Sequence, residues 1–195
     1  MKTFILSIIL VTGLNAFSAG NKFNAGDQVP VLALKNIHGE EVSVPNAQVK
    51  YVHLQFRRFA GCPICNLHLR SFVTRYEEIQ KAGVREVVVF HSPDTSLLTY
   101  QGKFPFDVIG DPEKKLYQQF GVETSIWALL NPKVWPSMVK GVMAKDKPTG
   151  DPEGGALGLP ADFLIGPDGK VVASHYGKYA TDNWEVGDVL KLAAK

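Results

Sequence analysis

The chain contains two cysteines, Cys62 and Cys65, and only two residues separate them. A cysteine thiolate is a nucleophile that forms mixed disulfides and oxidised species, and a second thiol within reach converts either of them into an intramolecular disulfide. The stretch FRRFAGCPICNLHLR places the pair where an apolar strand gives way to a helix. This spacing and placement predict a reversible dithiol–disulfide couple.

The start of a helix favours the ionised form of a thiol. Unpaired backbone N–H groups and the positive end of the helix dipole stabilise an anion there, and thiol pKa values of roughly 3.5 to 7.5 occur in such settings. Arg57 and Arg58 lie just upstream, and we expect either to add positive potential. Both cysteines remain candidates for the thiol that reacts first.

Three other interpretations of the pair are weaker. A structural disulfide across so short a loop would remove little entropy from the unfolded chain. Two inert core thiols would be unusual at a helix start. A zinc site needs two more ligands, and we expect neither a metal nor another cofactor, because no histidines show a zinc-finger spacing. The chain has five histidines: His38, His53, His68, His91 and His175.

Regular elements must position the pair. The run Tyr51 to Phe56 predicts a strand, and apolar residues spaced three or four apart predict a helix from Pro63 to Ala82 that ends at Gly83. Strands and helices then alternate, and a hairpin and a last helix close the chain, which predicts an α/β fold with a mixed sheet. Further strands are expected over 84–91, 106–109, 163–165 and 170–175, and helices over 94–101, 111–120 and 185–194.

Residues 124–157 lack this periodicity and are rich in proline and glycine. A loop of this length inside a compact domain is usually functional or a local insertion. The segment carries Trp127, Trp135, Met138 and Met143. We expect its aromatic side chains to cap one end of the core rather than to form a docking surface.

The first residues indicate where the protein works. Met1 and Lys2 precede the apolar run FILSIILVTGL and then small residues, a pattern typical of a signal peptide over residues 1–19. A buried first strand is the alternative. If the signal peptide is cleaved, residues 20–195 form one domain in the periplasm or outside the cell, without a stable membrane span. An uncleaved chain would be cytoplasmic. The net charge of +2 gives no reason to expect nucleic acid or an anionic membrane as a partner.

Two segments of the chain resemble peroxiredoxin-like proteins of the alkyl hydroperoxide reductase and thiol-specific antioxidant (AhpC/TSA) group, within the thioredoxin-fold superfamily. They are FRRFAGCPIC at 56–65 and GLPADFLIGPDGKVVASHYGK at 158–178. The resemblance covers about residues 25–195. It implies a thioredoxin-like α/β fold, with a mixed central sheet flanked by helices and an insertion before the last hairpin. It also implies that Pro160 is a cis proline that helps to position the substrate; a trans proline at the start of a strand is the alternative.

The chain departs from the family pattern around the reactive cysteine. Peroxiredoxins carry Pro and Thr or Ser upstream of it, where Gln55 and Phe59 stand if Cys62 reacts. They also use an arginine from later in the chain, and no arginine follows Arg85. Arg57, Arg58 or Arg70 would have to polarise the peroxide instead. The Cys62-Pro63 dipeptide does match the family.

Three hypotheses about function follow. The first is a thiol-dependent antioxidant oxidoreductase that reduces hydroperoxides through Cys62 and Cys65. The second is a thiol–disulfide oxidoreductase that acts on protein disulfides. Both need an external thiol or dithiol reductant. The third and weakest is a non-catalytic binding module with a redox fold. His68 and His91 lie near the predicted site, but no partner identifies either as catalytic.

Overall fold

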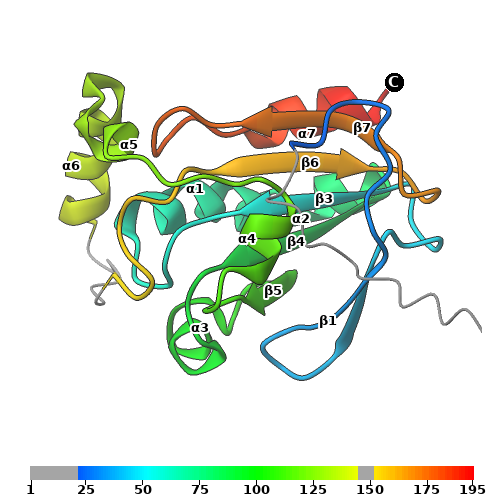
Figure 1. Cartoon of the computed structure of the whole chain (residues 1–195), viewed down its shortest axis with the longest axis horizontal. Coiled ribbons are helices and arrows are strands. Elements are labelled where there is room, and N and C mark those ends of the chain that lie inside the picture. Colours follow the sequence, from blue (N-terminus) through cyan, green and yellow to red (C-terminus); the bar gives the residue numbers. More distant parts are fainter. Residues whose placement is uncertain (1–21, 145–151) are drawn as a thin grey trace, which may run out of the picture.

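A five-stranded mixed sheet forms the centre of the molecule, in the strand order β5-β4-β3-β6-β7 (Figure 1). The parallel part consists of β3 (Tyr51–Phe56), β4 (Val84–Phe90) and β5 (Asp107–Gly110). β6 (Ala161–Ile165) pairs antiparallel with both β3 and β7 (Val171–Tyr176). The computed structural model describes residues 22–144 and 152–195. It confirms the mixed sheet predicted from the sequence.

Helices α1 (Pro63–Thr74), α2 (Tyr76–Lys81), α3 (Asp94–Gln101) and α7 (Val186–Ala193) contribute to the apolar core on one face of this sheet. Side chains alternate between the two faces along each strand. In β3 this alternation turns His53 and Gln55 towards α1, while Val52, Leu54 and Phe56 join the other core.

The opposite face is covered by α4 (Lys115–Gln119) and by an antiparallel hairpin of β1 (Leu32–Lys35) and β2 (Glu41–Val44). A turn in which Gly39 donates its N–H to the carbonyl of Asn36 at 2.8 Å joins these two strands. Phe56, Phe120 and Phe163 pack edge-on or tilted against one another in this layer, with ring centroids 5.2 to 5.9 Å apart.

Two predicted helices differ in detail from the observed ones. The helix expected over 63–82 is divided at Arg75, whose backbone leaves the helical region at φ −107°. Gly83 does end it, at φ +75°, a conformation that glycine adopts readily. The carboxylate of Asp111 accepts the backbone N–H of Lys115 at 2.9 Å at the start of α4, and Lys114 is the N-cap residue. The helix itself begins only at Lys115, one turn later than predicted.

The segment before β6 folds into α5 (Trp127–Leu130), the 3-10 helix η1 (Pro132–Val134) and α6 (Trp135–Met143), which lie at one end of the molecule (Figure 1). The expectation that its aromatic rings cap the core is wrong. Trp127 is 65% exposed and Trp135 60% exposed. Smaller side chains such as Ala128 and Val134 fill the space over the core instead, so the large rings point outward.

The predicted signal peptide, residues 1–19, lies outside the described residues. Within 22–144 and 152–195, no helix has the length and hydropathy needed to cross a bilayer.

Candidate active site

Cys62 and Cys65 are joined by a disulfide at the start of α1, with their Cα atoms 5.3 Å apart. Cys62 is the N-cap residue of the helix. Its Sγ accepts the backbone N–H of Cys65 at 3.2 Å, and Pro63 occupies the first helical turn, where its missing N–H costs nothing. The sulfur of Cys62 therefore holds the position in which a helix start stabilises an anion.

Arg58 supplies a cation to the same sulfur. Its Nη2 donates to Cys62 Sγ at 3.0 Å, and its Nη1 donates to the carbonyl oxygen of Ala156 at 3.0 Å. Arg58 is only 4% exposed, and burial lowers the pKa of its guanidinium to about 10, so the group stays charged at neutral pH. The carbonyl of Ala156 fixes the guanidinium in place beside the sulfur.

Arg57 points elsewhere. Its Nη2 donates to Gln55 Oε1 at 2.5 Å and to Asp162 Oδ1 at 2.7 Å, and its Nη1 donates to the carbonyl of Phe56 at 3.0 Å. Consecutive residues of extended chain face opposite ways, so only one of two adjacent arginines can turn towards the cysteine. The structure brings Arg58, and not Arg57, to Cys62 Sγ.

Polar side chains hold the loop that leads into Cys62. Asn66 Nδ2 donates to the carbonyl oxygens of Ala60 and Cys62 at 2.8 and 2.9 Å. Gln101 Nε2 donates to Asn66 Oδ1 at 2.7 Å and to the Ala60 carbonyl at 2.8 Å, and Ser92 Oγ accepts the Ala60 N–H at 3.0 Å. Sequence reasoning missed these three side chains, because each lies on a different element.

A buried charged network lies between the sheet and α1. His53 Nδ1 is 2.8 Å from Glu86 Oε2, and Asp162 binds Arg57. Burial alone would lower the pKa of His53, but the carboxylates of Glu86 and Asp162 raise it to about 9. Burial would raise the pKa of Asp162, but Arg57 and His53 hold it well below its usual value.

The sequence does contain a signal for this network. His53, Gln55 and Arg57 are polar residues at alternate positions of an otherwise apolar stretch, which indicates one polar face on a buried strand.

Two histidines near the pair are neutral at physiological pH. Burial, followed by the positive charge of Lys114, lowers the pKa of His91 to about 4; its Nδ1–H donates to the carbonyl of Glu153 at 2.9 Å. Burial and then the Arg57 cation lower the pKa of His68 to about 3, and its Nε2 lies 2.9 Å from the carbonyl of Trp184. Both histidines thus have backbone partners.

The insertion covers the cysteine pair. Cys62 is fully buried and Cys65 is 5% exposed. Both belong to the apolar core to which Val134 also contributes, with Leu129, Met138 and Ala156 packed against it. A side chain at Gly141 of α6 would have its Cβ 3.1 Å from the backbone of Pro63, so this helix lies directly on the start of α1. In this structure both cysteines are thus shielded from solvent.

The expectation that Pro160 is a cis proline is wrong. Among the described residues the only cis peptide bond is Val44–Pro45, so the Leu159–Pro160 bond is trans. Leu159 donates its N–H to the carbonyl of Glu123 at 3.0 Å, and the carbonyl of Pro160 accepts the N–H of Gly177 at 2.9 Å. These bonds hold both sides of Pro160 as it enters β6, and the trans form is the usual one for X–Pro bonds.

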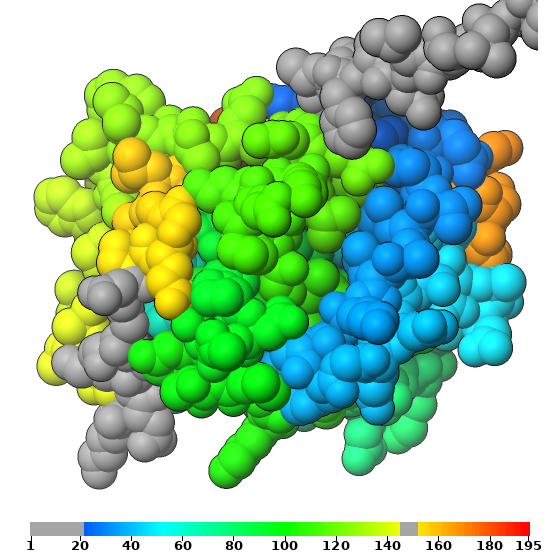
Figure 2. All heavy atoms as spheres, turned by 60° about the horizontal axis from the view of Figure 1, so that its bottom comes forward, coloured from blue at the N-terminus to red at the C-terminus, as the bar shows by residue number. Residues whose placement is uncertain are grey.

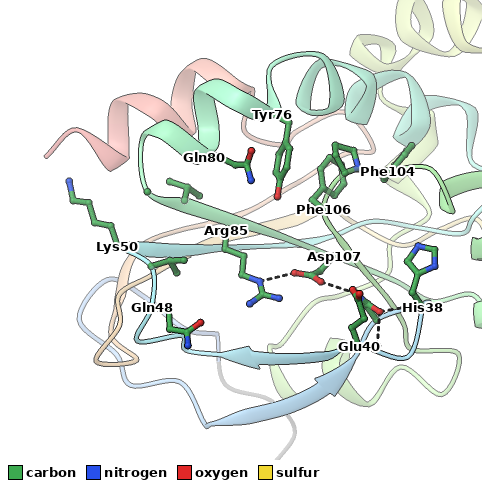
Figure 3. A pocket seen from close by; sticks show the side chains of 15 residues that line it. His38, Glu40, Gln48, Lys50, Tyr76, Gln80, Arg85, Phe104, Phe106 and Asp107 are labelled. Atoms are coloured by element: carbon green, nitrogen blue, oxygen red, sulfur yellow. Dashed lines mark hydrogen bonds and ion pairs between the residues drawn. The ribbon is translucent and has the colours of Figure 1, made fainter.

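A cavity of about 650 Å³ lies at the other end of the parallel strands (Figure 3). Residues at the starts of the parallel strands line this cavity, whereas Cys62 follows the end of β3. Three of its charged groups already have side-chain partners: Arg85 Nε lies 2.8 Å from Asp107 Oδ2, and Asn36 Nδ2 donates to Glu40 and Asp107 at 2.9 and 3.0 Å. This cavity is therefore separate from the cysteine site.

Residues 71–179 match the family model described as AhpC/TSA antioxidant enzyme. The chain belongs to this family. The matched segment covers more than half of the chain and begins after Cys65, so the roles of the two cysteines depend on the geometry above. No group of three or more His, Cys, Asp or Glu in the described parts of the chain could hold a metal ion.

Two curated relatives of the family are peroxiredoxins. The chain is 26% identical over 111 residues to chloroplastic peroxiredoxin Q of Sedum lineare, an alignment that covers 56% of this chain and 60% of that protein. It is 27% identical over 104 residues to peroxiredoxin Bcp of Escherichia coli, covering 52% of this chain and 67% of that protein. The aligned part of the chain thus covers about two thirds or less of the length of each relative.

Solved structures show the same fold. Peroxidoxin BcpB of Mycobacterium tuberculosis superposes with a TM-score of 0.65 at 16% identity, covering 88% of this chain and 97% of that one. A structure described as thiol:disulfide interchange protein DsbE of Chlorobium tepidum gives 0.56 at 19% identity, covering 89% and 95%. These likenesses confirm the thioredoxin-like fold expected from the sequence.

Proposed function

We propose that the chain is a thiol peroxidase that reduces hydroperoxides at Cys62 and uses Cys65 as the resolving thiol. One observation supports this most: Cys62 Sγ accepts hydrogen bonds from both the Arg58 guanidinium and the Cys65 amide. Each of these donors stabilises a thiolate more than a thiol. Family membership favours the same chemistry.

The reaction has two steps. The Cys62 thiolate attacks one oxygen of the hydroperoxide, so that an S–O bond forms and the O–O bond breaks; the leaving alkoxide takes up a proton and departs as an alcohol, or as water from hydrogen peroxide. The thiol of Cys65 then attacks the sulfenic sulfur, and a water molecule leaves as the disulfide forms. An external thiol or dithiol reduces the disulfide and restores both thiols.

Arg58 takes the role that the family gives to a later arginine. It is the one arginine that the structure brings to Cys62 Sγ among the described residues. A guanidinium at the sulfur also lies close to the oxygens of an attacking peroxide, where it stabilises the negative charge that develops on the leaving oxygen. The absence of arginine after Arg85 then does not count against peroxide chemistry.

Stopped-flow oxidation of the reduced protein tests this proposal. We expect hydrogen peroxide or an organic hydroperoxide to oxidise the protein much faster than free cysteine. In the Cys65→Ser variant a dimedone-type probe should trap a sulfenic acid on Cys62, whereas Cys62→Ser should give no adduct. If both single variants give none and the wild type reacts no faster than free cysteine, the peroxidase proposal fails.

A second candidate is thiol–disulfide exchange with protein disulfides. The observation that favours it is the disulfide across two residues at a helix start, which a dithiol needs in order to release a mixed disulfide. In that reaction Cys62 attacks the substrate disulfide and Cys65 displaces the substrate thiol. Reduction of insulin by dithiothreitol, with and without the protein, tests this activity. The Cys65→Ser variant should trap the mixed disulfide.

A further inference from the structure

Exposed apolar side chains gather at the end of the molecule formed by α5 and α6. Of the eleven large apolar side chains that are exposed in the described residues, seven lie between 126 and 143. Six of these are at least 56% exposed, and we call this set the apolar end face: Ile126, Trp127, Leu130, Trp135, Val139 and Met143. Such clustering marks a contact surface, because single exposed apolar residues are usually scattered.

Helix α6 has two apolar sides with different roles. Trp135, Val139 and Met143 are spaced four residues apart and lie on one side of the helix, facing outward. Gly141 lies on the other side and packs on Pro63. The core therefore needs only the inner side of this helix. The outer side adds nothing to the fold and exposes apolar area to water.

Helices α5 and α6 lie at one end of the molecule, beyond the ends of the strands, and form that end in the space-filling view (Figures 1 and 2). The hollow beside α6 is lined by Ser137 and Lys140 and by none of the six end-face residues. A peptide or a partner helix usually docks into a groove, whereas an exposed apolar helix with tryptophans is suited to the boundary between lipid headgroups and acyl chains. Position and composition thus favour a lipid surface.

The charge around the end face is complementary to anionic lipid. Residues 124–144 contain Lys133 and Lys140 and no Asp or Glu. Both lysines are exposed, and Lys133 Nζ lies 5.5 Å from the centre of the Tyr179 ring, which orients it. The preceding carboxylate, Glu123, is bound to Lys22 at 3.1 Å. Outside this segment, Glu185 of α7 lines the hollow beside Lys140. The segment's own charged side chains are both cationic, and a basic apolar segment is attracted to anionic headgroups.

We infer that the apolar end face docks on a lipid bilayer that carries anionic headgroups. The tryptophans and aliphatic side chains enter the interface, and the two lysines contact headgroups. The protein lies on the membrane and does not cross it. Since the inner side of α6 packs on Pro63, docking holds the cysteine pair close to the lipid surface. The net charge of +2 does not indicate a lipid partner, because the two lysines are a small part of the 21 lysines and arginines in the chain.

Vesicle co-sedimentation of the full chain tests the inference. The probes are vesicles of phosphatidylcholine alone and of phosphatidylcholine mixed with phosphatidylglycerol. We expect binding to the mixed vesicles that weakens with salt. Val139→Gln with Met143→Gln should weaken binding about tenfold or more. Lys133→Gln with Lys140→Gln should weaken it by up to about twenty-five-fold. The matched control is Val31→Gln with Val172→Gln, two exposed apolar residues outside the end face.

Tryptophan emission gives an independent readout. Two of the three tryptophans lie in the end face, and the third, Trp184, stacks on His53 with ring centroids 5.7 Å apart. Mixed vesicles should shift the emission of the wild type to shorter wavelength, and brominated lipids should quench it.

Three results would overturn the inference. The first is the absence of binding to mixed vesicles. The second is equal binding by the Val139/Met143 variant and the wild type, which would assign binding to another part such as the apolar N-terminal run. The third is a concentration-dependent dimer in analytical ultracentrifugation that this variant abolishes, which would make a second copy the occupant. None of these results bears on peroxide chemistry, which is measured separately.

Discussion

The guanidinium of Arg58 lies 3.0 Å from the sulfur of Cys62, only four residues further along the chain. A cation and a helix start thus act on one sulfur atom from a single short loop. The backbone N–H of Cys65, in the first turn of the helix, donates to that sulfur. The Arg58 guanidinium, which also donates to the carbonyl of Ala156, is the second donor. This arrangement distinguishes Cys62 from Cys65 and makes Cys62 the expected nucleophile.

Replacing Arg58 tests that relationship. In Arg58→Met the thiolate of Cys62 loses a charge-assisted hydrogen bond, so we expect its thiol pKa to rise and the rate of oxidation by peroxide at neutral pH to fall about tenfold or more. Alkylation rates measured against pH give the pKa, and stopped-flow fluorescence gives the rate. Arg75→Met is the matched control, because that arginine binds Glu78 on the surface of the helix. Equal rates in both variants would remove Arg58 from the mechanism.

The loop that precedes Cys62 should depend on Asn66. In Asn66→Ala the carbonyls of Ala60 and Cys62 lose a buried donor, and Gln101 loses an acceptor. We expect the free energy of unfolding to fall by about 1–3 kcal/mol and the yield of intramolecular disulfide after peroxide treatment to fall as well. Urea unfolding and thiol counting measure the two effects. Asn24→Ala, at an exposed position, should change neither.

The strands and helices follow from patterns that the sequence displays locally. The apolar run of β3 and the spacing of Leu69, Phe72 and Ile79 predicted those elements because burial selects the same residues in most contexts. The position of Cys62 at a helix start could be predicted for the same reason, since Pro63 marks the first turn.

Features that depend on distant parts of the chain were not predictable in this way. Arg57 and Arg58 are neighbours of the same type, and only the positions of Asp162 and Ala156 decide which one reaches the sulfur. Likewise, Trp127 and Trp135 were expected in the core because large apolar residues are usually buried. Smaller residues fill that space in the fold, and this outcome depends on how α5 and α6 pack.

The buried His53 predicts a pH dependence of stability. Its pKa in the folded protein is about 9, above the ordinary value of 6.5, because of the Glu86 and Asp162 carboxylates. The folded state therefore holds this proton more tightly than the unfolded state. The resulting stability is fully present below pH 6.5 and is lost as pH rises through about 9, to an extent of at most about 3 kcal/mol.

Chemical unfolding between pH 6 and about 9.5 checks this expectation. The decline in stability over that window should be smaller in His53→Gln than in the wild type, whatever the absolute stability of the variant. His38→Gln, at an exposed turn, should retain the wild-type slope. A wild-type slope in His53→Gln would show that other groups cause the decline.

The contact between α6 and Pro63 should control access to the cysteine pair. A valine at Gly141 would place its Cβ 3.1 Å from the Pro63 backbone and add two methyl groups to this tight contact, so we expect α6 to move away from α1. Because α6 and its neighbours cover the two sulfurs, we expect the reduced thiols of Gly141→Val to react several-fold faster with a bulky disulfide reagent.

Gly187→Val is the matched control, since no atom lies within 4 Å of a Cβ at that helical position. Both variants place a β-branched residue in a helix and share that cost in propensity, so the difference between them reports the cover alone. Faster reaction of both variants, or of neither, would mean that the cysteines become accessible by another route.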